Sequence, residues 1–186
     1  MLLSLTSTGC IFCAGIVGPL STQYIGNGRT IVTNWGFAMP GLGQASATYP
    51  LRYDVLYTIT YPATLTYPTD PGAIRWIRFW PGGQVDEGMR DFSKDPRRTV
   101  TAADGDNFLY WGAGRYSIRG DTIVVQTITG AEDILCAIHF STEKGHVNSD
   151  GSFTITERDG FAVNNAYTFY PTDVGKMTRE PDWQVK

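Results

Sequence analysis

Histidine and cysteine are scarce in this chain of 186 residues, which contains 2 histidines and 3 cysteines. Nucleophilic catalysis needs a nucleophile with a base within hydrogen-bond reach. Neither His139 nor His146 accompanies a Gly-x-Ser-x-Gly nucleophile motif. No second cysteine pair accompanies Cys10-Ile-Phe-Cys13, which leaves little basis for a zinc or redox site. We therefore expect no enzyme, no catalytic residue, no metal site and no cofactor, and a small envelope hydrolase is disfavoured.

Charge is also sparse. Charged residues make up 18% of the chain, against 42% hydrophobic and 13% aromatic residues, and the net charge is −3. This balance excludes a disordered chain. It gives no basic patch for nucleic acid, so no nucleic-acid partner is expected. The abundance of aromatic residues favours β structure.

The N-terminal region lacks charge altogether, and Arg29 is the first charged side chain. Residues 1–22 are interpreted as a signal or lipoprotein leader. Ser7-Thr8-Gly9-Cys10 resembles a bacterial lipoprotein box, so Cys10 is the predicted lipidation site and the protein is predicted to be exported, either lipid-anchored in the cell envelope or secreted. The leader lacks the usual Lys or Arg, which suggests a start codon further upstream. An ordinary cleaved signal and a genuine first strand are the alternatives.

A change in composition near residue 50 divides the rest of the chain. Residues 23–50 are rich in Gly, Ser, Thr and Pro and indicate an irregular tether. Residues 51–186 carry strand patterns and are assigned to one domain. Within it, residues 53–61 alternate between apolar and polar side chains, which predicts a half-buried strand. Residues 73–87 read as strand, Pro-Gly-Gly turn and strand, which predicts a hairpin.

The second half of the domain repeats this pattern. Short apolar segments are separated by turn residues at intervals of about 8–12 residues, which is typical of an antiparallel sandwich or barrel. Residues 90–107 are charged and are predicted to form a loop with one helical turn. The fold class is therefore all-β. The further predicted strands are residues 114–119, 122–128, 134–140, 152–156 and 166–170. Alternation along residues 114–119 predicts that Tyr116 and Ile118 point inward, and that Arg115, Ser117 and Arg119 face solvent.

The segment Gly114-Arg-Tyr-Ser-Ile-Arg-Gly-Asp-Thr-Ile123 resembles the central hairpin of bacterial lipocalin-like (calycin) domains. Residues 74–83, 150–155 and 167–169 resemble other strands of that family, and they follow in the same order. The resemblance implies an antiparallel up-and-down β-barrel of about eight strands. The interior of such a barrel is either filled by side chains or holds one small ligand.

The resemblance implies an extracytoplasmic binding module that holds a small apolar or amphipathic ligand. The alternative is a structural or protein-interaction lipoprotein with a side-chain-filled barrel. The expected partners are a small hydrophobic ligand, the membrane through a lipid anchor, and an unidentified protein. Large rings with polar handles are the best candidates for a pocket lining. The predicted ligand contacts are Tyr57, Ile59, Tyr116, Tyr167, Phe169 and Arg78.

The face on which Arg78 lies decides its role. Arg78 alternates with Trp76 and Trp80 on one side of its strand. If that side faces inward, Arg78 is a buried cation that needs an anionic ligand group or a carboxylate. If it faces outward, the two tryptophans are exposed and favour a protein or membrane contact. We favour the outward case, because Ile77 and Phe79 occupy the opposite face.

Overall fold

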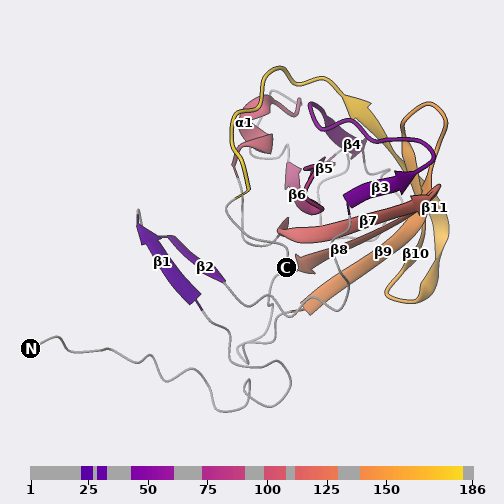
Figure 1. Cartoon of the computed structure of the whole chain (residues 1–186), viewed down its shortest axis with the longest axis horizontal. Coiled ribbons are helices and arrows are strands. Elements are labelled where there is room, and N and C mark those ends of the chain that lie inside the picture. Colours follow the sequence, from indigo (N-terminus) through magenta and orange to yellow (C-terminus); the bar gives the residue numbers. More distant parts are fainter. Residues whose placement is uncertain are drawn as a thin grey trace, which may run out of the picture.

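A computed structural model describes residues 22–26, 29–32, 43–60, 73–90, 99–107, 112–129 and 139–181. The predicted leader and Cys10 lie outside these residues. The described part is almost entirely β structure (Figure 1). Its elements are β1 (Thr22–Gly26), β2 (Arg29–Val32), β3 (Gly43–Ala47), β4 (Leu56–Thr60), β5 (Ile74–Phe79), β6 (Gln84–Arg90), α1 (Ala102–Gly105), β7 (Gly114–Gly120), β8 (Thr122–Thr129), β9 (His139–Val147), β10 (Phe153–Arg158) and β11 (Phe161–Thr172).

Eight strands, β4 to β11, form a closed antiparallel barrel. Each strand pairs with its neighbours in the sequence, and β11 closes the barrel by pairing with β4. This up-and-down order confirms the predicted all-β barrel. The architecture is compatible with a calycin. Strands β1 and β2 form a separate two-stranded sheet.

Strand β3 is an addition to the barrel, in a part of the chain that the sequence predicted to be a tether. It runs parallel to β7 and pairs with it from Ser117 to Gly120. Strand β6 pairs with β7 only through Gln84 and Val85. β3 therefore pairs with the part of β7 that β6 does not reach, and the barrel's sheet begins before residue 51.

The two ends of the barrel differ in their connections. At one end, tight turns join β5 to β6, β7 to β8 and β9 to β10, and we call this the turn end. At the other end, long segments separate β4 from β5, β6 from β7 and β8 from β9, and we call this the loop end. Only the β10–β11 hairpin closes the loop end with a two-residue turn, Asp159-Gly160, in which both residues have positive φ. Such turns match the twist of the strands they join.

Side chains alternate between the interior and the outer wall as strand geometry requires. On β7, Tyr116 and Ile118 are buried in the interior, whereas Arg115 and Ser117 are half-buried and Arg119 is exposed. This confirms the predicted register of that strand. Every strand from β4 to β11 contributes to the interior cluster, and β9 does so only through its turn-end half.

Part of the outer wall is covered by two segments, residues 99–107 and residues 173–181, which we call the cover. The first contains α1, and the second runs beside it after β11 (Figure 1). Asp106 joins the two segments, because its carboxylate accepts hydrogen bonds from the backbone amides of Thr178 and Arg179 at 2.9 and 3.0 Å. The cover makes a second, smaller buried layer outside the barrel.

Candidate functional site

The turn-end half of the barrel interior is filled by aromatic rings. Phe79 packs against Tyr116 with ring centroids 4.8 Å apart, and against Tyr57 at 5.4 Å. Phe153 stacks on Phe169 at 4.8 Å. All five side chains are fully buried. Rings in such edge and offset contacts stabilise each other beyond the burial of their area, so this half is a packed core.

Two tyrosine hydroxyls in this core hold the turn end together. Tyr116 donates a hydrogen bond to the carbonyl of Trp80 at 2.9 Å, and the hydroxyl of Tyr57 accepts one from the amide of Arg52 at 2.8 Å. Burial raises the pKa of Tyr57 to about 12 and also raises the pKa of Tyr116. Both hydroxyls are therefore neutral and serve as hydrogen-bonding groups at physiological pH.

The structure places five of the predicted ligand contacts in the barrel interior. The side chains of Tyr57, Tyr116 and Phe169 belong to the packed core, and those of Ile59 and Tyr167 lie against it. Their role in binding stays a prediction. Among them, only Tyr167 reaches the polar groups of the loop end.

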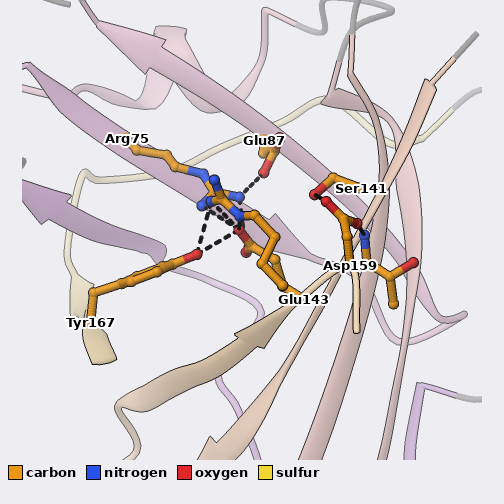
Figure 2. A network of polar contacts seen from close by, with 8 residues as sticks. Arg75, Glu87, Ser141, Glu143, Asp159 and Tyr167 are labelled. Carbon is orange, nitrogen blue, oxygen red and sulfur yellow. Dashed lines mark hydrogen bonds and ion pairs between the residues drawn. The ribbon is translucent and has the colours of Figure 1, made fainter. Parts of the chain in front are cut away.

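A layer of charged side chains lies inside the barrel at the loop end, and we call it the charged layer. It contains two arginines and two glutamates, together with the hydroxyl of Tyr167 (Figure 2). The charges balance, as buried charges must if their desolvation is to be offset. Its members are Arg75 on β5, Glu87 on β6, Glu143 on β9, Arg158 on β10 and Tyr167 on β11.

Glu143 is the centre of this layer. Arg75 binds its two carboxylate oxygens at 2.9 and 3.0 Å, the bidentate geometry that an arginine fork favours. Arg158 binds the same carboxylate through Nε at 2.9 Å and also through Nη2. Tyr167 donates its hydroxyl proton to Oε1 at 2.6 Å. Arg75 also forms an ion pair with Glu87.

This geometry fixes the protonation state of Glu143. Burial by itself would raise the pKa of this carboxyl. The charges and hydrogen bonds of Arg75, the charge of Arg158 and the hydrogen bond from Tyr167 outweigh burial and hold the pKa at about 2. The pKa of Tyr167 is raised, first by burial and then by the Glu143 charge. The layer therefore contains a carboxylate and a neutral phenol at any physiological pH.

Two exposed apolar side chains lie at the rim above the charged layer in the part of the chain that the structure describes. Phe161 lies directly across the β10–β11 turn from Arg158 and is 77% exposed. Met89 lies directly across from Arg75 and is 48% exposed. Directly paired residues in an antiparallel sheet share a face, so each interior arginine has an exposed apolar neighbour on its own face. Asp159 ties the turn to β9 by accepting a hydrogen bond from the amide of Thr142 at 2.7 Å.

Arg158 keeps hydrogen-bonding capacity at this rim. Its Nε and Nη2 atoms bind Glu143 and Tyr167, but Nη1 has no hydrogen-bond partner among the described residues. The side chain is 28% exposed, so Nη1 is within reach of solvent. The rim thus combines an available guanidinium donor with two exposed apolar side chains, Phe161 and Met89.

Arg78 lies elsewhere. The predicted outward orientation is confirmed, because Ile77 and Phe79 fill the interior. The predicted exposure of Trp76 and Trp80 was wrong, because each is only 4% exposed, and the Trp76 ring packs over Gly88 on the neighbouring strand β6. Arg78 stacks on Trp80 at 4.5 Å and donates through Nη1 to Asp106 and to the carbonyl of Gly105, both at 2.8 Å. The structure therefore places it outside the barrel interior, where it anchors the cover.

The sequence reasoning missed Arg75, Glu87, Glu143 and Arg158. A signal was present for Arg75, which shares a strand face with the inward Ile77 and Phe79. A charge on the apolar face of a strand predicts a buried ion pair or a functional site. No group of three or more His, Cys, Asp or Glu side chains in the described ranges is placed to hold a metal ion.

Comparison with known proteins found no family model, no curated protein and no solved structure that matches this chain. Within the described ranges, no helix has the length and hydropathy needed to cross a membrane.

Proposed function

We propose that this protein is a binding module that takes an amphipathic ligand at the loop end of its barrel. The observation that carries the proposal is the pairing of the charged layer with an exposed apolar rim. A polar or anionic group of the ligand meets Nη1 of Arg158, and its apolar part lies against Phe161 and Met89. Binding sites commonly combine an apolar lining with a few placed polar groups that fix orientation.

The packed aromatic core sets the depth of the site. Rings of Tyr57, Phe79 and Tyr116 occupy the turn-end half, so the ligand binds near the rim and does not pass through the barrel. This differs from the expectation of a ligand enclosed among these rings. The same filled core supports the second candidate, a protein-interaction module in which a partner protein contacts the loop end. The two candidates differ in whether a small amphipathic molecule binds by itself.

Two fluorescent probes that share a naphthalene ring separate these cases: anilinonaphthalene sulfonate, which is anionic, and phenylnaphthylamine, which is neutral. Arg158→Gln is expected to weaken sulfonate binding about tenfold, because a hydrogen bond to a charged group is worth about 1.5–3 kcal/mol. The same variant is expected to change binding of the neutral probe less than about twofold. Phe161→Ser, at an exposed position, is expected to weaken both.

The matched control is Arg119→Gln, which removes an exposed arginine at the turn end. It is expected to leave both affinities unchanged. Equal losses in Arg119→Gln and Arg158→Gln would show that the sulfonate responds only to net charge and would contradict the proposed site. If neither probe binds, the protein-interaction module is favoured.

Export and lipidation complete the proposal. They are supported by the uncharged leader and by the small residues that precede Cys10. Mass spectrometry of protein expressed in a Gram-negative host, with a basic n-region restored, is expected to find acylation on Cys10. Cys10→Ala should abolish the modification and Cys13→Ala should leave it. Acylation on Cys13, or none, would contradict the assignment.

A further inference from the structure

A carboxyl group outside the barrel is buried without a partner at hydrogen-bond geometry among the described residues. Asp86 lies on the outer-wall face of β6, beneath the cover, and its side chain is 0% exposed. Among the residues that the structure describes, neither of its carboxylate oxygens has a hydrogen-bond partner. Buried polar groups in proteins are nearly always hydrogen-bonded, and an unpaired one signals strain or a function. A fully ionised carboxylate in this place would be costly.

The charged groups around Asp86 come from four packed elements and from β6 itself. Arg78 on β5 lies directly across from it in the sheet. Arg179, in the C-terminal segment of the cover, also acts on it electrostatically. Glu87 is its neighbour along β6, but faces the barrel interior. The other charged groups near this wall are Asp106 at the end of α1 and Arg115 on β7, which lies directly across from Gln84 of β6.

Both nearby arginines are engaged elsewhere. Arg78 donates through Nη1 to the Asp106 carboxylate at 2.8 Å, and Arg179 donates through its amide to the same carboxylate at 3.0 Å and through Nη1 to the Asp106 carbonyl at 3.1 Å. These contacts attach the cover to the wall. Neither arginine forms an ion pair with Asp86 in the described part of the chain.

The backbone at Gly112 closely approaches Asp86. A Cβ atom on Gly112 would lie 2.9 Å from Asp86 Oδ1 and 1.8 Å from the carbonyl oxygen of Glu87. Burial raises the pKa of Asp86 well above its ordinary value, and the negative charge of Glu87 raises it further. These effects outweigh the backbone amide of Glu87 and the charges of Arg179 and Arg78, which lower the pKa. With the cover closed, Asp86 therefore keeps its proton to a higher pH than an exposed aspartate does.

We propose that Asp86 is a proton-operated latch that keeps the cover closed while it is protonated and releases it on ionisation. An ionised Asp86 needs donors, and the nearby guanidinium groups of Arg78 and Arg179 both bind Asp106. Asp86 and Asp106 therefore compete for the same arginines. Drawing these side chains toward Asp86 weakens the attachment of Asp106 to the wall and releases the cover, so rising pH uncovers the outer wall beside Arg78.

Amide hydrogen exchange of the intact chain across pH 5–9 tests the latch. If opening of the cover is linked to ionisation of Asp86 alone, the equilibrium constant for opening rises about tenfold per pH unit between the ordinary pKa of an aspartate and the raised pKa of the closed state. Above the raised pKa, this equilibrium constant no longer changes with pH. The protection of the Thr178 and Arg179 amides, relative to unstructured peptide rates, is expected to fall with that slope. The amides of Tyr116 and Val147, which bond within the barrel, are expected to keep constant protection.

Asp86→Asn keeps the shape of the neutral acid and cannot ionise, so it is expected to remove the slope, leaving less than about a twofold change over the range. The control Asp121→Asn, in the exposed β7–β8 turn, is expected to retain the wild-type slope. A flat wild-type profile, or an unchanged slope in Asp86→Asn, would overturn the proposal. If Asp86→Asn does not fold, the pKa of Asp86 is measured in the wild type by titrating its carboxyl carbon. An ordinary pKa overturns the latch. A raised pKa supports it, provided that the Thr178 amide titrates together with the carboxyl group.

Discussion

Replacing Glu143 by glutamine removes the carboxylate that Arg75 and Arg158 share inside the barrel. The variant keeps the shape and one acceptor oxygen, but leaves the buried Arg75 and the half-buried Arg158 with Glu87 as the remaining carboxylate in the charged layer. Breaking a buried ion pair by removing one partner costs about 3–5 kcal/mol. Because glutamine can still accept a hydrogen bond, we expect the lower end, about 3 kcal/mol at pH 7.

The pKa of Glu143 gives a second way to work out the stability that its carboxylate contributes. Folding lowers it from 4.5 to about 2. At about 1.4 kcal/mol per pH unit, this difference corresponds to about 3 kcal/mol of stability. Because the pKa in the folded state is lower than in the unfolded state, this stability is present above pH 4.5 and is lost as the pH falls toward 2.

Urea denaturation at pH 7, 5 and 3 measures both effects. The wild type is expected to lose stability below pH 4.5 and Glu143→Gln to lose much less there, so that the two curves converge in acid. Glu157→Gln is the matched control, because Glu157 lies on β10 and makes no ion pair among the described residues. A loss below about 1 kcal/mol at pH 7, or the same acid dependence in the variant, would refute the account of the charged layer.

Four further substitutions test the barrel itself by urea denaturation and circular dichroism. Tyr116→Ala is expected to cost about 3–5 kcal/mol, because its ring is fully buried in the core, and Arg119→Ala less than about 0.5 kcal/mol; the reverse ranking would mean that β7 has the opposite register. Gly160→Ala is expected to cost about 1–2 kcal/mol from its positive φ alone, since no atom lies within 4 Å of the new methyl group, and an unchanged stability would contradict the turn. Gly145→Ala is expected to disrupt the β9–β10 pairing, because its Cβ would lie 1.8 Å from the Thr154 carbonyl oxygen, and a native spectrum would argue against this close approach.

Strand periodicity is the part of this fold that could be predicted from the sequence. The alternation in residues 53–61 and 114–119 placed Tyr57, Ile59, Tyr116 and Ile118 on the interior face, where the structure has them. Such predictions succeed because a one-residue slip would expose an entire apolar set. The spacing of the strands left a sandwich or a barrel open, and the resemblance to lipocalin-like domains implied the up-and-down barrel.

Strand β9 shows where periodicity fails. The sequence predicted a strand over residues 134–140, but β9 covers His139–Val147, and residues 130–138 lie outside the described ranges. The run Ser141-Thr-Glu-Lys-Gly-His146 lacks apolar residues, because its inner face carries Glu143 and Gly145 and its outer face is exposed. A strand that contributes charge to a barrel interior has no hydrophobic pattern to detect.

The charged layer and the cover depend on contacts between distant residues. Arg75 and Glu143 are 68 positions apart, and closure of the barrel brings them together. Residues 99–107 and 173–181 cover the wall at Leu56 and Arg78, although their polar sequences give no sign of packing there. Alternation identifies the two faces of a strand, but only tertiary structure decides whether the outer one meets water.

The location of a bound amphipathic molecule tests the central claim most directly. Titrating isotope-labelled protein with anilinonaphthalene sulfonate and following backbone amide shifts maps the contact site. We predict the largest changes at Met89, Arg158 and Phe161, with the amides of Tyr116 and Ser152 at the turn end unchanged. Largest changes at the turn end, or shifts scattered over the outer wall, would contradict binding at the loop end of the barrel.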